Sequence, residues 1–277
     1  MLYPIVFVPI YKKMVWGYES WDISCRVHEM SLVENGSLAG MRFEDVIKKN
    51  PPLMLGTKTD VFPLLVKIIG ADDDLSIQVH PDDGYAAAHG FESGKNEMWC
   101  IIETPGRLII GLKDGTTPQM LKHEPMACLN MLPVAPGDFI SIEAGLVHAI
   151  VGGTVLAEIQ QNSDVTFRIF DYGRKGIDGK PRQLHLDHAI AVTDFAGRIK
   201  KDVCQEVSTP FFNVRKLRVA GWHQGETTPE SFVILTCVDG EVEINGVSLA
   251  NRRSAFLPAG LGRYFVNGDA VLLVTTL

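Results

Sequence analysis

Short hydrophobic runs, separated by glycine, proline or polar turns, dominate the pattern along the chain. Such runs predict β-strands, and their short spacing indicates a sandwich or a barrel. The expected strands cover residues 62–69, 98–102, 107–111, 138–142, 155–159 and 166–170. Helical patterns are few. Expected helices cover residues 42–49, ended by Asn50-Pro51-Pro52, then 117–129, opened by Thr117-Pro118, and 186–193. The pattern therefore predicts a mostly β protein with a few short helices.

One expected strand carries chemistry on one of its faces. In residues 75–83, Ser76, Gln78 and His80 alternate with apolar residues, and Pro81 ends the run. Alternate residues of a strand point to the same face, so these three polar side chains should share one face. A polar face on a strand within core-like sequence is typical of a strand that lines a site.

Two further segments add potential metal ligands. Glu97 follows Gly94-Lys95-Asn96, and His148 follows two glycines, Gly137 and Gly145. This second spacing resembles the second conserved motif of cupins, apart from Glu143 where a proline is usual. Taken singly, His80 beside a proline is typical of a turn or core histidine, and Glu97 of a solvated hairpin.

Together, the three segments offer a nitrogen and oxygen ligand set of Gln78, His80, Glu97 and His148. Two imidazoles and a carboxylate suit Zn²⁺, with further positions open to water or substrate. The set also suits Fe²⁺, Mn²⁺ or Co²⁺, because the order of affinity alone does not fix the metal. We expect one Zn²⁺ per chain.

Composition limits the class of protein. The chain has 277 residues, of which 46% are hydrophobic and 21% charged, and its formal net charge is −7. These values indicate an ordinary globular protein and argue against nucleic acid as a main partner. No apolar run approaches the length that spans a bilayer, and the first residues do not resemble a signal peptide. We expect a cytoplasmic protein without a membrane partner, either monomeric or homodimeric.

The cysteines are odd in number and widely spaced, and no C-x2-C pair occurs, which excludes a cysteine zinc site. They are Cys25, Cys100, Cys128, Cys204 and Cys237. The simplest interpretation is free, partly buried thiols in a reducing compartment.

A composition shift at residues 193–201 separates a long first region from a shorter second region. The second region repeats part of the first: residues 144–148 correspond to residues 259–263, with Arg263 in place of His148. We therefore expect two cupin-like β-barrels or jelly rolls. Residues 1–195 would form a catalytic domain with the metal site, and residues 196–277 a metal-free C-terminal domain.

At this point the chain resembles the type I mannose-6-phosphate isomerases, in their short bacterial and archaeal form. The matching segments occur in order over roughly residues 1–190, and the last 80 residues are covered weakly. They are Tyr3-Pro4, Trp16-Gly17, residues 19–24, 62–67, 75–83, 94–99, 145–149 and 158–164, Arg168, residues 171–174 and 182–185. One departure is the short connection Gly17-Tyr18-Glu19, where the family has a longer loop, and the helical domain of the eukaryotic forms is absent.

The resemblance implies an aldose–ketose isomerase that interconverts mannose 6-phosphate and fructose 6-phosphate through a cis-enediol. It implies metal ligation by Gln78, His80, Glu97 and His148. It also implies substrate contacts at Lys67, Ser76, Lys95, Glu158, Arg168 and Arg174. We expect Arg168, Lys95 and Glu158 to be catalytic, and Lys67, Ser76 and Arg174 to bind substrate or its phosphate. The general base stays open among Glu158, Lys95, Asp171 and a metal-bound hydroxide.

Each of these residues also has a structural interpretation. Lys67 could lie at a barrel edge, Arg168 in a cross-strand ion pair and Glu158 in a structural contact. The segment His185-Leu186-Asp187-His188 looks like a metal cluster, but His188 is expected to begin a helix. Two other functions compete with the isomerase: a cupin dioxygenase or other metal-dependent oxidoreductase, and a non-catalytic sugar-phosphate-binding cupin. Gln78 and the basic pocket argue against the first, and the intact ligand set against the second.

Overall fold

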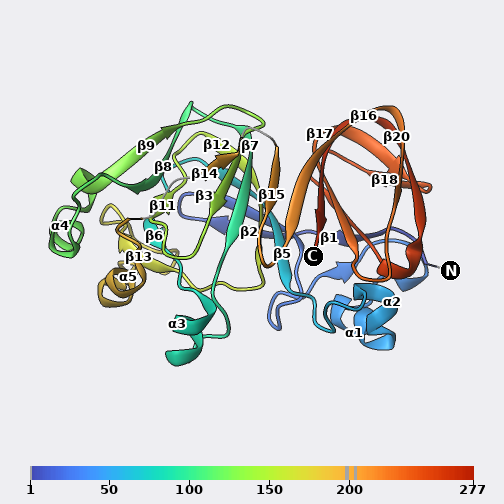
Figure 1. The fold of residues 1–277 in the computed structure, drawn as a ribbon, viewed down its shortest axis with the longest axis horizontal. Helices are drawn as coiled ribbons and strands as arrows, with labels where there is room; N and C mark the ends of the chain where they lie inside the picture. The colour runs from blue at the N-terminus through green and yellow to red at the C-terminus, as the bar shows by residue number, and fades with distance from the viewer. Residues whose placement is uncertain (1, 197–199, 203–204) are drawn as a thin grey trace. The chain divides into compact units, whose positions relative to one another are not determined.

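The computed structural model describes residues 2–196, 200–202 and 205–277, and its described residues form three β-sheets (Figure 1). Contacts divide the chain into two compact units. The first unit contains residues 1–10, 20–68 and 204–277, and the second contains residues 11–19 and 69–203. The expected mostly β fold with few helices is confirmed. The expected boundary between residues 195 and 196 stays a prediction, and part of the composition shift that suggested it lies outside the described residues.

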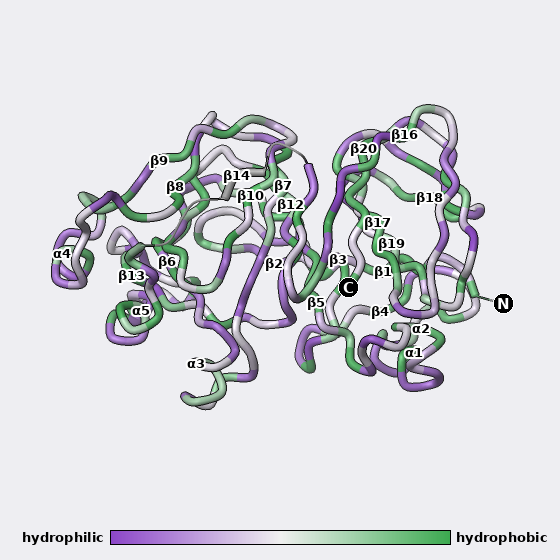
Figure 2. Tube along the Cα trace, in the orientation of Figure 1, coloured by the Kyte–Doolittle hydropathy of each residue, from purple (hydrophilic) through white to green (hydrophobic). Residues whose placement is uncertain are grey.

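One sheet belongs to the first unit, and its order is β15-β16-β20-β17-β19-β1-β4, with β18 paired to β17. The strands are β1 (Ile5–Val8), β4 (Leu32–Val33), β15 (Glu206–Ser208), β16 (Asn213–Glu226), β17 (Val233–Ile244), β18 (Val247–Leu249), β19 (Ser254–Leu257) and β20 (Arg263–Thr276). β17 starts with a hydrophobic run, green in Figure 2, that packs into an apolar core. This unit also contains α1 (Phe43–Lys49), α2 (Pro51–Leu55) and the short 3-10 helices η1 (Gly36–Leu38) and η3 (Ala259–Leu261).

The other two sheets carry the strands of the second unit. A seven-stranded sheet has the order β14-β10-β7-β12-β5-β3-β2, and a five-stranded sheet has the order β13-β6-β11-β8-β9. The first consists of β2 (Ile10–Met14), β3 (Gly17–Ile23), β5 (Leu64–Ala71), β7 (Glu97–Glu103), β10 (Phe139–Ile142), β12 (Thr154–Gln161) and β14 (Lys200–Asp202). The second consists of β6 (Ile77–Val79), β8 (Arg107–Leu112), β9 (Leu129–Pro133), β11 (His148–Ala149) and β13 (Phe167–Phe170). Strands β3 and β5 each run from one unit into the other.

The second unit also carries α3 (Asp83–Ala88), α4 (Pro118–His123), the 3-10 helix η2 (Pro125–Cys128) and α5 (Leu186–Val192). The helix expected at 186–193 is confirmed as α5, and that at 42–49 as α1. The helix expected at 117–129 was too long: α4 ends at His123, because Pro125 disfavours helical backbone at Glu124.

Two helices were not expected from the sequence. Asn50 ends α1, but its side chain also accepts the N–H of Leu53 at 3.2 Å and so caps α2. Asp82 likewise caps α3, accepting the N–H of Tyr85 at 2.7 Å. At Asn50, one residue therefore ends one helix and begins the next.

The described cysteines Cys25, Cys100, Cys128 and Cys237 are free thiols, and all but Cys25 are buried. Cys204 lies outside the described residues. Among those residues, no helix is both long enough and apolar enough to span a bilayer.

Candidate metal centre and active site

Three buried side chains from separate elements of the second unit converge on one point. His80 follows β6, Glu97 begins β7, and His148 begins β11. Their potential ligand atoms all lie within 4.8 Å of one another. The Nε2 atom of His80 lies 3.7 Å from Glu97 Oε2, and the Nε2 atom of His148 lies 3.5 Å from Glu97 Oε1. Among the described residues, this is the one His, Cys, Asp and Glu group with the geometry of a metal site.

The backbone fixes which ring nitrogen of each histidine faces the centre. His80 Nδ1 lies 2.8 Å from the carbonyl oxygen of Val165, and His148 Nδ1 lies 2.8 Å from that of Leu146. A carbonyl oxygen only accepts, so each Nδ1 carries the proton and each Nε2 keeps its lone pair. In its neutral form each imidazole therefore presents the lone pair of Nε2 to the centre, the arrangement that metal-binding histidines use.

Electrostatics hold the centre in its ligand form. Burial and the nearby Lys95 ammonium together lower the pKa of His80 to about 3, against the opposing effect of Glu97. Burial likewise lowers the pKa of His148. For Glu97, burial acts to raise the pKa, but the Lys95 ammonium holds it well below its usual range. The carboxyl is thus ionised while both imidazoles are neutral.

Lys95 supplies the positive charge beside this buried carboxylate. Its Nζ lies 2.8 Å from Glu97 Oε2, and its side chain is itself buried. The segment that carries it packs tightly against residues 81–83, which follow β6. A Cβ added at Gly94 would lie 2.4 Å from the carbonyl carbon of Asp82, so only glycine fits there. The backbone N–H of Lys95 donates to the carbonyl of Pro81 at 2.9 Å.

Polar side chains fix the same segment from its other side. The Gln161 side-chain oxygen accepts both the backbone N–H and the side-chain amide of Asn96, each at 2.8 Å. Asn96 Oδ1 in turn accepts the N–H of Ala144 at 3.0 Å, and Gly145 donates its N–H to the carbonyl of His80 at 2.9 Å. These bonds link the segments that carry Glu97, His80 and His148. The sequence reasoning assigned no role to Asn96, although it stands between two candidate site residues.

Gln78 and Arg168 stand in one row with His148 across the five-stranded sheet. His148 pairs with Gln78 in the β11–β6 register, and Gln78 pairs with Arg168 in the β6–β13 register. Paired residues of antiparallel strands point to the same face, so all three side chains share one face. Burial lowers the pKa of Arg168, Arg182 adds to this, and the buried Nε of Arg168 has no hydrogen-bond partner among the described residues.

The side chain of Gln78 reaches the centre through its amide. Its Nε2 lies 3.3 Å from His148 Nε2, and its Oε1 accepts the hydroxyl of Ser76 at 3.3 Å. Ser76 and Gln78 therefore lie on one face, as the alternation predicted. To ligate a metal, Gln78 would need Oε1 rather than Nε2 on the side of His148. Half a turn of the amide group about its terminal bond gives this arrangement.

Glu158 belongs to the seven-stranded sheet, on β12. It pairs with Trp99 in the β12–β7 register, and the Trp99 indole N–H donates to Glu158 Oε2 at 2.9 Å. Two positions along, Gln160 pairs with Glu97, so Glu158 shares the face of the carboxylate ligand. Trp99 also contacts His148 edge-on, with ring centres 5.4 Å apart. The structure thus brings Glu158 to the wall of the centre as a buried carboxyl group.

A short arginine-rich turn follows β13. Arg182 forms a two-pronged ion pair with Asp171, with Nε 2.6 Å from Oδ2. Arg174 packs on the ring of Tyr172 and donates through Nη2 to the carbonyl of Asp74. The buried Nη1 of Arg174 has no hydrogen-bond partner among the described residues. Arg182 lies in a segment that resembles the family, but the sequence did not predict a role for it. The structure shows that it forms an ion pair with Asp171.

Lys67 belongs to the first unit, where its Nζ lies 5.3 Å from the ring centre of Trp21. Its expected contact with substrate stays a prediction. The suspected metal cluster at His185 and His188 does not form. His185 Nδ1 accepts the backbone N–H of Arg168 at 3.2 Å, whereas His188 Nδ1 lies 2.9 Å from the hydroxyl of Tyr85.

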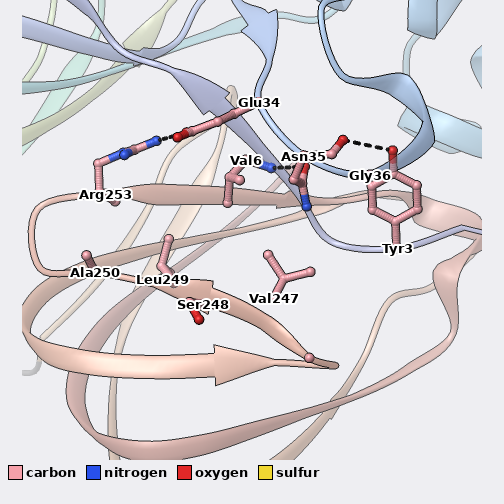
Figure 3. Close-up of a pocket in the computed structure, with 11 residues that line it drawn as sticks. Tyr3, Val6, Glu34, Asn35, Gly36, Val247, Ser248, Leu249, Ala250 and Arg253 are labelled. Atoms are coloured by element: carbon pink, nitrogen blue, oxygen red, sulfur yellow. Dashed lines mark hydrogen bonds and ion pairs between the residues drawn. The ribbon is translucent and has the colours of Figure 1, made fainter.

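The first unit contains a separate cavity of about 580 Å³ between β18 and the segment that precedes η1 (Figure 3). Arg253 and Tyr3 both line it. Arg253 is bound to Glu34 at 2.6 Å and to the carbonyl of Phe7, and Tyr3 donates its hydroxyl to the carbonyl of Asn35. The polar groups of this cavity are used within the protein. It shows none of the convergent ligand atoms that mark the second unit.

The donor set of the second unit fits a divalent metal. The buried Nε2 of His80 and the buried Oε1 of Glu97 have no hydrogen-bond partner among the described residues. Buried polar atoms are rarely left in this state, and a cation would satisfy both. The ligand atoms are nitrogen and oxygen without sulfur, a set that zinc and other divalent transition metals accept.

Comparisons with known proteins give matches along the whole chain. Residues 12–97 match the family model of the phosphomannose isomerase type I catalytic domain, and residues 203–277 match that of the mannose-6-phosphate isomerase cupin domain. The mannose-6-phosphate isomerase ManA of Bacillus subtilis is 31% identical, covering 99% of each chain. That of Streptococcus mutans is 31% identical over 93% of this chain and 87% of its own. The crystal structure of the mannose 6-phosphate isomerase from Bacillus subtilis superposes with a TM-score of 0.87, 26% identity and 99% coverage of both chains.

Proposed function

Because the chain belongs to the type I phosphomannose isomerase family, we propose that it interconverts mannose 6-phosphate and fructose 6-phosphate at the centre formed by His80, Glu97 and His148. The observation that carries this proposal is the buried triad, in which both imidazoles present Nε2 beside an ionised carboxylate. We further propose that Gln78 completes the ligand set and that the native metal is Zn²⁺, one per chain. Held there, the metal would act as a Lewis acid that polarises the sugar carbonyl.

The reaction moves one proton between C2 and C1 through a cis-enediol, so it needs a base within reach of both carbons. Glu158 and Lys95 are our candidates, since each is buried beside the centre. Asp171 is a weaker candidate than the sequence suggested, because both of its oxygens are engaged by Arg182. The same group takes the proton from one carbon and returns it to the other, and a hydroxyl proton passes between O2 and O1, so the atoms balance and no oxidant or reductant is required.

Charge must be stabilised at two further places on the substrate. We propose that the guanidinium of Arg168, in one row with Gln78 and His148, stabilises the negative charge that develops on the enediolate oxygen. Arg174, whose Nη1 is buried without a partner, and the Ser76 hydroxyl would hold the phosphate, together with Lys67. The substrate is a small sugar phosphate, and we place the protein in the cytoplasm without a nucleic-acid or membrane partner.

The test is an isomerase assay on mannose 6-phosphate with the metal removed and restored. The purified protein should form fructose 6-phosphate, chelator should abolish turnover, and Zn²⁺ should restore it. Full turnover by metal-free protein would overturn the role of the metal. Binding of mannose 6-phosphate without turnover would favour a sugar-phosphate-binding cupin, and oxygen-dependent consumption of the sugar would favour an oxidoreductase.

A further inference from the structure

The strand that carries Arg168 lies at the edge of its sheet. β13 pairs with β6 on one side only, and the register shifts between Arg168 and Phe170. An edge strand presents backbone N–H and C=O groups that the sheet does not use. At Arg168 these groups determine where the guanidinium points, because the side chain follows the backbone that bears it.

One residue takes both backbone groups of Arg168. The backbone N–H of Arg168 donates to His185 Nδ1 at 3.2 Å, and the backbone N–H of His185 donates to the carbonyl of Arg168 at 2.8 Å. His185 therefore acts on the outer side of β13 as a neighbouring strand would. Because both groups point outward, Arg168 and Gln78 form a non-hydrogen-bonded pair, the type in which facing side chains lie closest.

The position of His185 is itself fixed by α5, which lies beside β13 (Figure 1). His185 immediately precedes this helix, and the backbone N–H of the buried Ala189 donates to the His185 carbonyl at 2.8 Å. The imidazole makes no capping bond to the helix, so its ring is committed to Arg168. The side chain thus connects a packed helix to one backbone position of the edge strand.

We propose that His185 is a positioning residue: its neutral imidazole and its backbone N–H together fix the backbone of Arg168, so that the guanidinium stands beside Gln78 and His148. This inference rests on the proposed role of Arg168 in the reaction. His185 does not touch the substrate. It acts through Arg168 alone, and a shift of that backbone by about 1 Å is enough to lower a rate by about 100-fold.

The bond to Arg168 requires an unprotonated Nδ1, because a donor cannot face the N–H of Arg168. Burial, the Arg168 guanidinium and His188 all lower the pKa of His185, which favours the neutral ring. The nearest carboxyl on the same helix is Asp187, which is exposed and lies 3.3 Å from Lys122 of α4. Since the pKa is lowered, protonation breaks the bond only in acid, as the pH falls through the lowered value.

Two substitutions at His185 separate positioning from general stability. His185→Asn keeps an acceptor at nearly the position of Nδ1 and cannot titrate, whereas His185→Ala removes the acceptor. The matched control is His188→Ala, which alters the first turn of α5 and removes the contact with Tyr85 but no bond to Arg168. Two properties are measured for each protein: hydrogen exchange of the Arg168 amide, and the kinetics with mannose 6-phosphate.

His185→Ala should speed exchange of the Arg168 amide and lower kcat about 10- to 100-fold with KM changed less than about 3-fold. His185→Asn should keep both properties near wild type. Its kcat should no longer show the fall in acid that protonation of His185 causes in the wild-type protein. His188→Ala should leave exchange at Arg168 unchanged.

Unchanged exchange in His185→Ala would overturn the inference, whatever the activity. Faster exchange with a normal kcat would overturn the positioning role, and so would equal losses of kcat in His185→Asn and His185→Ala. If the wild-type protein shows no isomerase activity but His185→Ala still speeds exchange of the Arg168 amide, the contact is supported and the proposed function is overturned instead.

Discussion

A buried carboxyl group beside a basic residue occurs in each unit of the molecule, and two of these groups, Glu97 and Asp22, have opposite pKa shifts. In the second unit, Glu97 lies 2.8 Å from Lys95 and beside two imidazoles, and its pKa is held well below the usual range. In the first unit, burial raises the pKa of Asp22 to about 7, and Arg253 and Ser254 offset only part of that effect. Arg253 is committed to Glu34 at 2.6 Å. A buried carboxyl is therefore ionised or neutral according to whether a cation is directed at it.

A second contrast concerns the last residue of two segments with similar sequences. Residues 144–148 end in His148, which is fully buried among polar groups, whereas residues 259–263 end in Arg263, which is exposed. A core cluster of the first unit consists of residues from β1, β16, β17, β18, β19 and β20. The segment in the second unit thus ends in the ligand cluster, and the segment in the first unit ends at an exposed arginine.

The largest difference between the two units is expected in kcat, when Arg168 of the second unit is replaced by lysine. Lysine keeps the charge but loses the planar guanidinium, so kcat should fall by at least ~10²-fold with KM changed much less. The same change at Arg253, in the first unit, should leave kcat unaltered. Steady-state kinetics and zinc content are measured for both variants. Near-normal kcat with a greatly raised KM for Arg168→Lys would make Arg168 a substrate-binding residue and pass the catalytic role to Lys95 or Glu158.

A smaller effect is expected from Arg174→Ala. Loss of one charge-assisted contact of about 1.5–3 kcal/mol should raise KM for mannose 6-phosphate by ~10–100-fold and leave the weak reaction of unphosphorylated mannose nearly unchanged. Arg263→Ala, at the related exposed position, serves as the control. If Arg174→Ala impairs both sugars equally, Arg174 is structural, through its bond to Asp74.

The smallest effect is expected from Asp22→Asn, and it concerns stability alone. The folded-state pKa of Asp22, about 7, lies above the unfolded value of about 3.9, so the folded protein binds this proton more tightly. The contribution of Asp22 to the free energy of unfolding is present in acid and is lost as the pH rises from about 4 through about 7, by at most ~1.4 kcal/mol per pH unit. Asp22→Asn should remove this slope and leave kcat unchanged. Denaturant unfolding of both proteins at several pH values measures it, and identical slopes would mean that Asp22 is ionised in the folded protein.

The local pattern was enough to predict much of the β structure and the cluster of ligands. Alternation placed Ser76 and Gln78 on one face, and the spacing of Gly137, Gly145 and His148 pointed to a buried histidine. One failure occurs where a single residue serves two elements, since Asn50 ends α1 and also caps α2. Another is Asp82, whose role as the cap of α3 was missed because it follows Pro81, where the strand was expected to end.

The sequence did not predict which strands pair when they lie far apart along the chain. β1 pairs with β19, so that Ile5 faces Phe256, and no local pattern indicates a partner at that separation. The long strands β16 and β20 were missed as well, because their outer residues are exposed and only part of each strand has a regular apolar alternation. Within the site, the contact between His185 and Arg168 depends on a sheet edge and a helix start that meet only after folding.

The metal content of the purified protein tests the central claim most directly, namely that the second unit holds one metal ion on His80, Glu97 and His148. Elemental analysis compares wild type, His148→Ala and, as a matched control, His223→Ala from β16 of the first unit. Wild type and the control should each carry close to one metal ion per chain, and His148→Ala should carry almost none while keeping the wild-type β-sheet circular dichroism. A His148→Ala protein that retains the full wild-type metal content would contradict the account.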